Sequence, residues 1–148
     1  MLTIRKCKKE DLPRILELIK ELAEYEKELH QVSNTVEKME QDGFGPKSIF
    51  ESLVADLNNK IIGASVYYFR YSTWKGKRLY LEDLIVTKAH RRNGVGKLLF
   101  EKTIEIAKAT NCSGMMWQVL HWNEPAINFY KKYSTGFDEE WVNCNIDF

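Results

Sequence analysis

The chain has 148 residues, of which 44% are hydrophobic and 29% charged, the balance of a globular domain and not of a disordered chain. Its 22 basic and 21 acidic residues leave a formal charge of +1, so no global field attracts nucleic acid or an anionic membrane. No apolar run approaches the ~20 residues that span a bilayer. Since no linker or repeat divides the chain, we expect one domain over residues 1–148, with no nucleic-acid or membrane partner.

The N-terminal residues alternate in charge and lack the apolar centre of a secretory signal, which favours a cytosolic protein. The three cysteines, Cys7, Cys112 and Cys144, are odd in number and lack the spacing of a metal site. We therefore expect reduced, structural thiols and no bound metal.

The apolar pattern predicts strands and helices along the whole chain. Residues 2–5 are expected to form an edge strand, followed by a helix from Leu12 to about Tyr25 with Asp11 as its cap and Pro13 in its first turn. The later elements are expected to be a helix at 36–41, a loop at 42–46, strands at 52–57, 61–71 and 80–86, a helix after Gly96, a strand at 115–120, a helix at 125–133 and a last strand at 141–146. This order describes an α/β fold, a sheet layer with helices on its faces.

The stretch Arg91-Arg92-Asn93-Gly94-Val95-Gly96 stands between a predicted strand and a predicted helix. Its glycines allow a tight turn, and free amides at a helix N-terminus favour an anion. The turn suits a pyrophosphate, with positive charge from Arg91, Arg92 and Lys97. The same pattern is also typical of a plain connection, and it lacks the Gly-Lys-Ser/Thr of a Walker A motif and the third glycine of a dinucleotide fingerprint.

The order of strand, Arg-x-x-Gly-x-Gly, helix, strand, Asn and a Tyr-containing helix resembles the GNAT acetyltransferase superfamily. Five segments resemble more specifically its diamine (spermidine/spermine) and thialysine N-acetyltransferases: ELAEYE at 21–26, DGFG at 42–45, YYF at 67–69, YLED at 80–83 and WNEPAINFYK at 122–131. The resemblance implies a single mixed and largely antiparallel sheet with a splay between two central strands and helices on both faces. It also implies a homodimer and direct acetyl transfer from acetyl-CoA to a primary amine.

In this family acetyl-CoA lies along the strand before the motif, so the resemblance assigns the pantetheine arm to the backbone of Leu84, Ile85 and Val86. Pantetheine contains two amides and can extend a sheet as an added strand. A strand amide could also bind the thioester oxygen, a contact worth roughly 3–4 kcal/mol in acyl transfer. The resemblance assigns further cofactor contacts to Arg91, Arg92, Asn93, Gly94, Val95, Gly96 and Lys97 and, later in the chain, to Asn123, Glu124, Pro125, Ala126 and Tyr130.

Two residues are expected to carry the proton transfers. The resemblance makes Tyr130 the general acid for the departing thiolate, whereas its spacing alone favours a core tyrosine. A primary ammonium, with a pKa of about 10.4, must lose its proton before it attacks, and a carboxylate can accept that proton. Glu82 and Asp83 are candidates. Since consecutive strand residues point to opposite faces, only one is expected to face the site, and the resemblance points to Glu82. A solvent-exposed carboxylate is the alternative.

The resemblance assigns the amine acceptor to Tyr25, Glu26, Ser72, Glu82, Asp83, Met116, Trp117 and Gln118. Tyr25 and Glu26 also suit a solvated helix end, and Met116 and Trp117 also suit the core. His121 is a further candidate base, although family members tend to carry an acidic residue there. Polyamine-acetylating members carry an acidic residue at the position of Ser72, and residues 71–77 resemble the thialysine branch. We therefore expect short diamines or lysine-like amines to be better acceptors than spermine.

Other functions stay open. A GNAT enzyme acting on a peptide N-terminus or an antibiotic amine would share the fold. A non-catalytic acetyl-CoA-binding module would lack an acid and base pair such as Tyr130 and Glu82. A nucleotide-binding module would need a Mg²⁺-binding Ser or Thr after the glycines.

Overall fold

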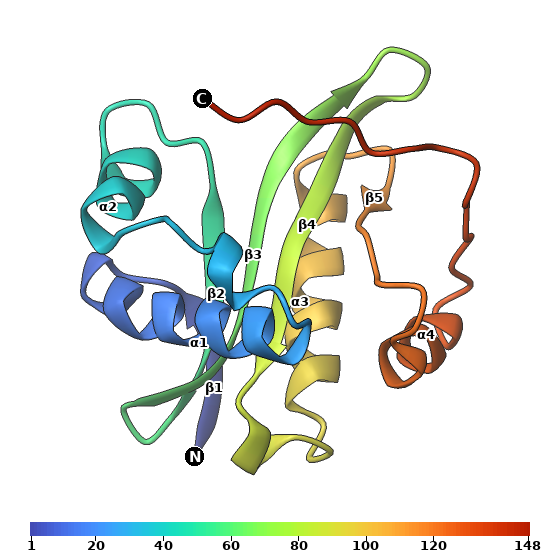
Figure 1. The fold of residues 1–148 in the computed structure, drawn as a ribbon. Helices are drawn as coiled ribbons and strands as arrows, with labels where there is room; N and C mark the ends of the chain where they lie inside the picture. Colours follow the sequence, from blue (N-terminus) through green and yellow to red (C-terminus); the bar gives the residue numbers. More distant parts are fainter. The chain divides into compact units, whose positions relative to one another are not determined.

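The computed structural model describes all residues, Met1–Phe148. The chain forms two compact units, Met1–Gln118 and Val119–Phe148. The first unit contains a five-stranded sheet and three α-helices, and the second contains the helix α4 (Glu124–Lys131) (Figure 1). That both units belong to one acetyltransferase domain stays a prediction. No helix of the structure has the length and apolar character needed to cross a bilayer.

The sheet has the strand order β1-β2-β3-β4-β5. Its first four strands pair antiparallel with their neighbours, and the fifth pairs parallel with the fourth. The strands are β1 (Leu2–Lys6), β2 (Glu51–Leu57), β3 (Lys60–Ser72), β4 (Gly76–Val86) and β5 (Met115–Met116). The predicted mixed, largely antiparallel sheet is therefore confirmed.

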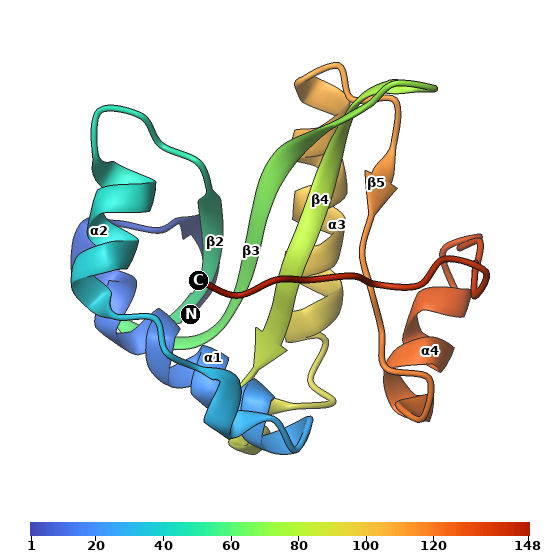
Figure 2. The same ribbon diagram turned by 45° about the horizontal axis from the view of Figure 1, so that its top comes forward.

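Helices cover both faces of the sheet. Val54, Ala64 and Ile85 stand opposite one another on three adjacent strands and pack into one core with α1 (Leu12–Tyr25) and α2 (Val36–Phe44). The neighbouring Ser65 faces the other side, where its hydroxyl accepts a hydrogen bond from Thr103 of α3 (Val95–Ala109) at 3.0 Å. Successive strand residues point to opposite faces, so α1 and α3 lie on opposite sides of the sheet (Figures 1 and 2).

The predicted splay lies between β4 and β5. These strands pair only at Leu79 with Met115 and at Tyr80 with Met116. β4 continues to Val86 with β3 on one side and no strand on the other. The last six residues of β4 therefore present an open backbone edge.

Two local predictions about helix ends were wrong. The helix α2 runs to Phe44, through part of the predicted loop, because Gly43 lets the helix pack against the ring of Phe50: a Cβ there would lie 2.6 Å from the ring. Asp11 stands at the N-cap position of α1, as predicted, but its side chain does not cap the helix. Its carboxylate accepts hydrogen bonds from the Lys8 amide and the Arg5 guanidinium instead.

Two strand predictions were also wrong in extent. The strand predicted at 115–120 is limited to Met115–Met116, and residues 141–146 form no strand. Trp141 and Ile146 are 74% and 84% exposed. Their residue types favour extended structure, but a strand also needs a neighbour for its backbone hydrogen bonds, which a local pattern cannot supply.

Candidate active site

A β-bulge in β4 shapes the acidic end of the site. Asp83 stands opposite Val66 of β3, while Leu81 stands opposite the next residue, Tyr67. Glu82 is therefore an extra residue with no partner, which breaks the alternation of side chains at this point. Tyr68 lies on the same face as Val66, and its hydroxyl donates to the Glu82 carboxylate at 3.5 Å. Glu82 and Asp83 thus share the face covered by α1, whereas strict alternation would place them on opposite faces.

Three predicted carboxylates interact on this face. Burial, reinforced by the negative charges of Glu82 and Glu26, raises the pKa of Asp83 to about 7. Burial also raises the pKa of Glu26, which follows the C-terminus of α1. No lysine or arginine lies within salt-bridge distance of these three carboxylates, and they are not close enough to hold a metal ion. Carboxylates without a basic partner can attract a cation.

Two stacked tyrosines continue this face. The rings of Tyr68 and Tyr80 lie 5.2 Å apart with an interplanar angle of 30°. Burial and the negative charge of Glu82 raise the pKa of both phenols, and the Arg70 guanidinium partly opposes this effect. Both rings are therefore neutral at pH 7. They provide an apolar, π-rich surface beside the carboxylates, which suits the methylene chain of an aliphatic amine.

The open edge of β4 can receive an extended amide chain. The amide of Thr87 donates to the Ile62 carbonyl of β3. Because hydrogen-bonded pairs alternate along an antiparallel ladder, the backbone groups of Leu84 and Val86 point away from β3, and those of Ile85 point toward it. The Val86 carbonyl accepts from Arg91 Nε at 2.9 Å. Of the three predicted strand residues, Leu84 and Val86 therefore provide the amides at this edge.

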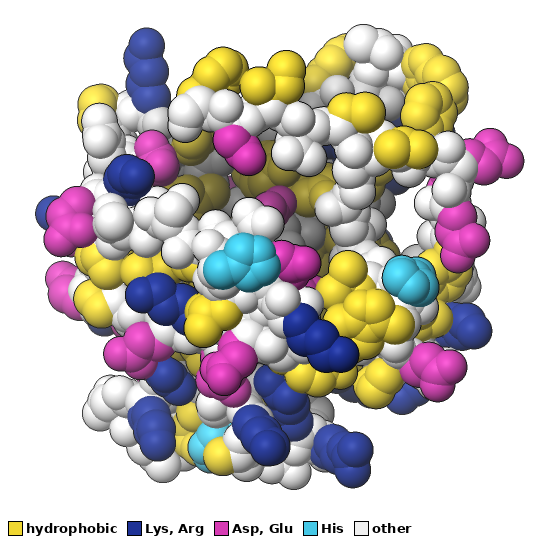
Figure 3. Space-filling model, in the orientation of Figure 1, with side chains coloured by type: hydrophobic (Ala, Val, Ile, Leu, Met, Phe, Trp, Pro, Cys, Tyr) yellow, Lys and Arg dark blue, Asp and Glu magenta, His cyan; other side chains and the backbone are white.

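The turn between β4 and α3 fits an anion. Gly94 has φ of +79°, and an added Cβ would meet no atom within 4 Å. The first helical hydrogen bond after it runs from the Leu98 amide to the Gly94 carbonyl. The amides of Val95, Gly96 and Lys97 therefore have no acceptor within the helix. Lys and Arg side chains gather at the lower end of the face in Figure 3, where Figure 1 places this turn.

Arg91 holds the turn together. Besides its bond to the Val86 carbonyl, its guanidinium lies 3.7 Å from the Glu21 carboxylate and 5.5 Å from the centre of the Tyr25 ring. Arg92 and Asn93 are exposed, and Arg92 also has a positive φ, of 66°. The charge expected from Arg91 is therefore partly neutralised within the protein, whereas Arg92 and Lys97 remain on the surface of the turn.

Glu21 is a residue of the site that sequence reasoning did not single out. Its carboxylate accepts hydrogen bonds from the Lys88 amide at 2.8 Å and from the Thr87 hydroxyl at 3.0 Å, and it faces Arg91. One side chain of α1 thus fixes the start of the turn. Its position in the ELAEYE segment, which resembles the family, could have indicated a functional role. Its partners lie 66 residues or more along the chain, so a local sequence pattern could not predict them.

Three residues predicted to bind the acceptor differ in position or orientation from the carboxylates and the stacked tyrosines. Ser72 ends β3, and its hydroxyl accepts hydrogen bonds from the Trp74 and Lys75 amides of the hairpin turn. Trp117 packs edge-on against Phe100 of α3, at a centroid distance of 5.3 Å, away from the tyrosine face. Gln118 follows at the end of the first unit and is exposed. Met116, in contrast, stands opposite Tyr80.

The second unit contains the remaining predicted residues. Asn123 caps α4 by accepting a hydrogen bond from the Ala126 amide at 3.3 Å, and Pro125 lies in the first turn beside Glu124. Tyr130 is buried, and its carbonyl accepts from the Thr135 hydroxyl at 2.6 Å. His121 is exposed before this helix. The roles of these residues at the cofactor stay predictions.

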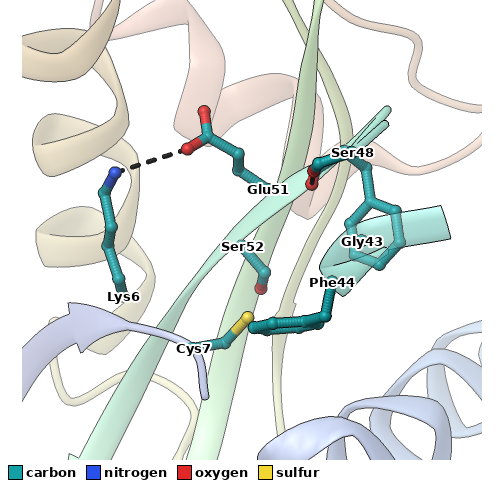
Figure 4. Close-up of a pocket in the computed structure, with 8 residues that line it drawn as sticks. Lys6, Cys7, Gly43, Phe44, Ser48, Glu51 and Ser52 are labelled. Atoms are coloured by element: carbon teal, nitrogen blue, oxygen red, sulfur yellow. Dashed lines mark hydrogen bonds and ion pairs between the residues drawn. The ribbon is translucent and has the colours of Figure 1, made fainter. Parts of the chain in front are cut away.

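A separate small cavity of about 160 Å³ lies beside α2 and β2 (Figure 4). Lys6 and Glu51 form an ion pair of 3.3 Å at its edge, and Cys7 lines it. Burial raises the pKa of the Cys7 thiol to about 11, so the thiol is protonated and a poor nucleophile at pH 7. None of the predicted site residues lines this cavity.

Known proteins match most of this chain. The model of the acetyltransferase (GNAT) family matches residues 12–137. The thialysine N-epsilon-acetyltransferase of Mus musculus is 39% identical over 136 residues, which cover 86% of this chain and 80% of that protein. The spermidine/spermine N(1)-acetyltransferase-like protein 1 of Homo sapiens is 39% identical over 134 residues, which cover 86% of this chain and 19% of that protein.

Solved structures share the fold. An aminoglycoside acetyltransferase from an uncultured soil metagenomic sample, in complex with sisomicin, has a TM-score of 0.79 at 22% identity, covering 99% of this chain and 96% of that chain. The BH1408 protein of Bacillus halodurans has a TM-score of 0.81 at 22% identity, covering 97% of this chain and 99% of that chain. With a family model that spans most of its length and relatives of this similarity, the chain belongs to the GNAT family of acetyltransferases.

Proposed function

We propose that this protein transfers the acetyl group of acetyl-CoA to the primary amine of a small cationic acceptor, such as a short diamine, a polyamine or a lysine-like amine. The observation that carries the proposal is the bulge at Glu82, which turns two carboxylates toward one face just before the open edge of β4. An acceptor ammonium bound there lies beside a strand edge suited to an acyl donor. The names of the thialysine and spermidine/spermine relatives support this acceptor class.

Different residues of the chain have different roles in this proposal. Bound acetyl-CoA supplies the thioester. The amides of Leu84 and Val86 hold its amide chain, and those of Val95, Gly96 and Lys97 hold its pyrophosphate. Glu82, directly or through a water molecule, takes the proton that the ammonium must lose, and Asp83 and Glu26 attract the cation.

Tyr130 is the proposed acid that donates a proton to the departing thiolate. Phenylalanine keeps the ring but has no proton to give, so Tyr130→Phe is expected to lower kcat by roughly 10²–10⁴, with the Kd for acetyl-CoA little changed. Single-turnover kinetics and calorimetry separate the two effects. Tyr133→Phe, which removes a hydroxyl two residues after the end of the same helix, is the matched control. A fall of less than fivefold in Tyr130→Phe would assign Tyr130 to packing.

Acetyl-CoA consumption tests the proposed acceptor class. The panel consists of a short diamine, spermidine, spermine, lysine, thialysine, an aminoglycoside and a peptide with a free N-terminus. Turnover on the small amines is the expected result. Turnover confined to the peptide or the aminoglycoside would overturn the acceptor class, and acetyl-CoA binding without turnover on any amine would point to a binding module.

We further propose a homodimer in the cytosol. The family resemblance supports a dimer, and the hairpin between β3 and β4 carries exposed aromatic side chains, Tyr71 at 75% and Trp74 at 84% exposure, of the kind enriched in protein interfaces. Light scattering at assay concentration tests it: the mass of two chains is expected, and the mass of one chain would overturn the proposal.

A further inference from the structure

Arg70 is a cation on the tyrosine face that has no acidic partner. It lies on β3 two residues after Tyr68, so both side chains share one face of the strand. Its guanidinium lies 5.9 Å from the centre of the Tyr80 ring and donates from Nη1 to the Met116 sulfur at 2.7 Å. No carboxylate lies within salt-bridge distance of it. A thioether is a weak acceptor, so the guanidinium keeps most of its hydrogen-bonding capacity.

The face therefore has opposite charges at its two ends. Glu82 and Asp83 form one end, the stacked rings of Tyr68 and Tyr80 form the middle, and Arg70 forms the other end. Asp83 stands opposite Val66, four residues before Arg70 on β3, which corresponds to roughly 13 Å along the strand.

A lysine-like amino acid carries an ammonium and a carboxylate whose separation is of the same order. Six bonds join the side-chain nitrogen of lysine to its carboxyl carbon, a span of roughly 7.5 Å when extended. A charge-assisted hydrogen bond of about 2.8 Å at each end extends this reach to roughly 13 Å, the same order as the separation of the strand positions that carry the two charges. An arginine fork also binds a carboxylate through two parallel hydrogen bonds. The apolar middle of such a ligand would lie along the two tyrosine rings.

We propose that Arg70 binds the carboxylate of an amino-acid acceptor and so makes this site prefer lysine-like amino acids over diamines of the same length. The inference rests on the proposed function. A diamine places no anion at Arg70, and a polyamine places a second ammonium there, which the guanidinium repels. Ser72 does not take this role, because its hydroxyl is already an acceptor for two amides of the hairpin turn.

Pairs of substrates that differ only in a carboxyl group measure the effect of the substrate carboxylate. Lysine is compared with 1,5-diaminopentane, and ornithine with 1,4-diaminobutane, since each diamine is the amino acid without its carboxyl group. In the unmodified protein, kcat/KM is expected to be about 10 to 100 times higher for the amino acid, the range of a charge-assisted hydrogen bond. Arg70→Gln should bring the ratio close to one, and Arg70→Glu should reverse it. Arg70→Lys, which keeps the charge without the fork, should retain part of the preference.

Lys75→Gln is the charge-matched control, because it removes one exposed cation from the turn of the same hairpin and should leave the ratio unchanged. Thermal unfolding of each variant checks that the fold persists. Equal kcat/KM values for the paired substrates, or a ratio unaffected by Arg70→Gln, would overturn the role of Arg70 while amine acetylation stands. No turnover on any amine would overturn the proposed function and the role of Arg70 with it.

Discussion

The acidic face and the turn before α3 each join β4 or the residues after it to α1, yet they hold charge in opposite ways. On the acidic face, Glu26, Glu82 and Asp83 lie together without a basic partner, and the pKa of Asp83 rises to about 7. In the turn, Arg91 is paired with Glu21, and the backbone amides stay available. The acidic face therefore has unbalanced negative charge, whereas the turn contains an ion pair within the protein and leaves its amides for an anion.

This comparison separates the two halves of the reaction. In the proposed function the carboxylates bind the acceptor and take its proton, so changes there should act on kcat and on pH dependence. The turn is proposed to bind the acyl donor, so changes there should act on the affinity for acetyl-CoA. Four substitutions test that separation.

The largest effect is expected from Glu82→Gln. Glutamine still accepts the hydrogen bond from Tyr68 but cannot take a proton at neutral pH, so kcat should fall by roughly 10²–10⁴ while the Kd for acetyl-CoA is unchanged. Steady-state kinetics and calorimetry measure the two quantities. Glu105→Gln, which removes a carboxylate from the exposed side of α3, should be neutral. Nearly full activity in Glu82→Gln would assign proton transfer to another group.

Gly94→Val should weaken acetyl-CoA binding at least tenfold with little change in kcat at saturation. The open space above Gly94 lets a ligand approach the backbone, and the valine side chain would fill it. Gly76→Val is a matched control, since Gly76 has φ of +84° and equally open surroundings at the hairpin. Both variants should lose similar thermal stability because of their positive φ. If both bind acetyl-CoA as tightly as the parent, the turn is not the pyrophosphate site.

Asp83→Asn should change the pH dependence of stability. The folded-state pKa of about 7 lies above the usual value of 3.8, so the folded protein binds more protons than the unfolded chain between these pH values. The free energy of unfolding therefore falls as pH rises from about 4 to about 7. Asparagine removes this fall, which should stabilise the variant relative to its parent by on the order of 4 kcal/mol at pH 8. Urea unfolding of both proteins at pH 5 and pH 8 measures their free energies of unfolding. The same difference between variant and parent at both pH values would contradict the prediction.

Glu21→Ala should give the smallest effect, a rise of roughly 3- to 10-fold in KM for acetyl-CoA with kcat preserved. It removes the acceptor for the Lys88 amide and the Thr87 hydroxyl, and each such bond contributes about 1 kcal/mol. Glu17→Ala, which removes an exposed ion pair from the same helix, is the control. A fall in kcat alone would place Glu21 with the acceptor side of the site.

Most helices and strands along the chain and the Arg-x-x-Gly-x-Gly turn could be predicted from the residues because their signals are local, whereas the mixed, largely antiparallel sheet was implied by the family resemblance. Apolar periodicity marks α1 and α3, and the glycines mark the one place where a left-handed φ precedes a helix. The family resemblance added the carboxylates Glu26, Glu82 and Asp83, which the fold does bring together. It also added Ser72 and Trp117, whose side chains the fold directs to a hairpin turn and to α3.

The remaining features depend on contacts between distant residues. The bulge at Glu82 arises from the register of β4 against β3, so strict alternation along one strand misplaces one of the two carboxylates. The pairing of Glu21 with the start of the turn joins residues 66 or more positions apart. Residues 141–146 have the composition of a strand but no partner strand. Local residue patterns carry conformational preference, whereas register, charge pairing and strand completion are properties of the assembled chain, because each needs a second segment at the right distance.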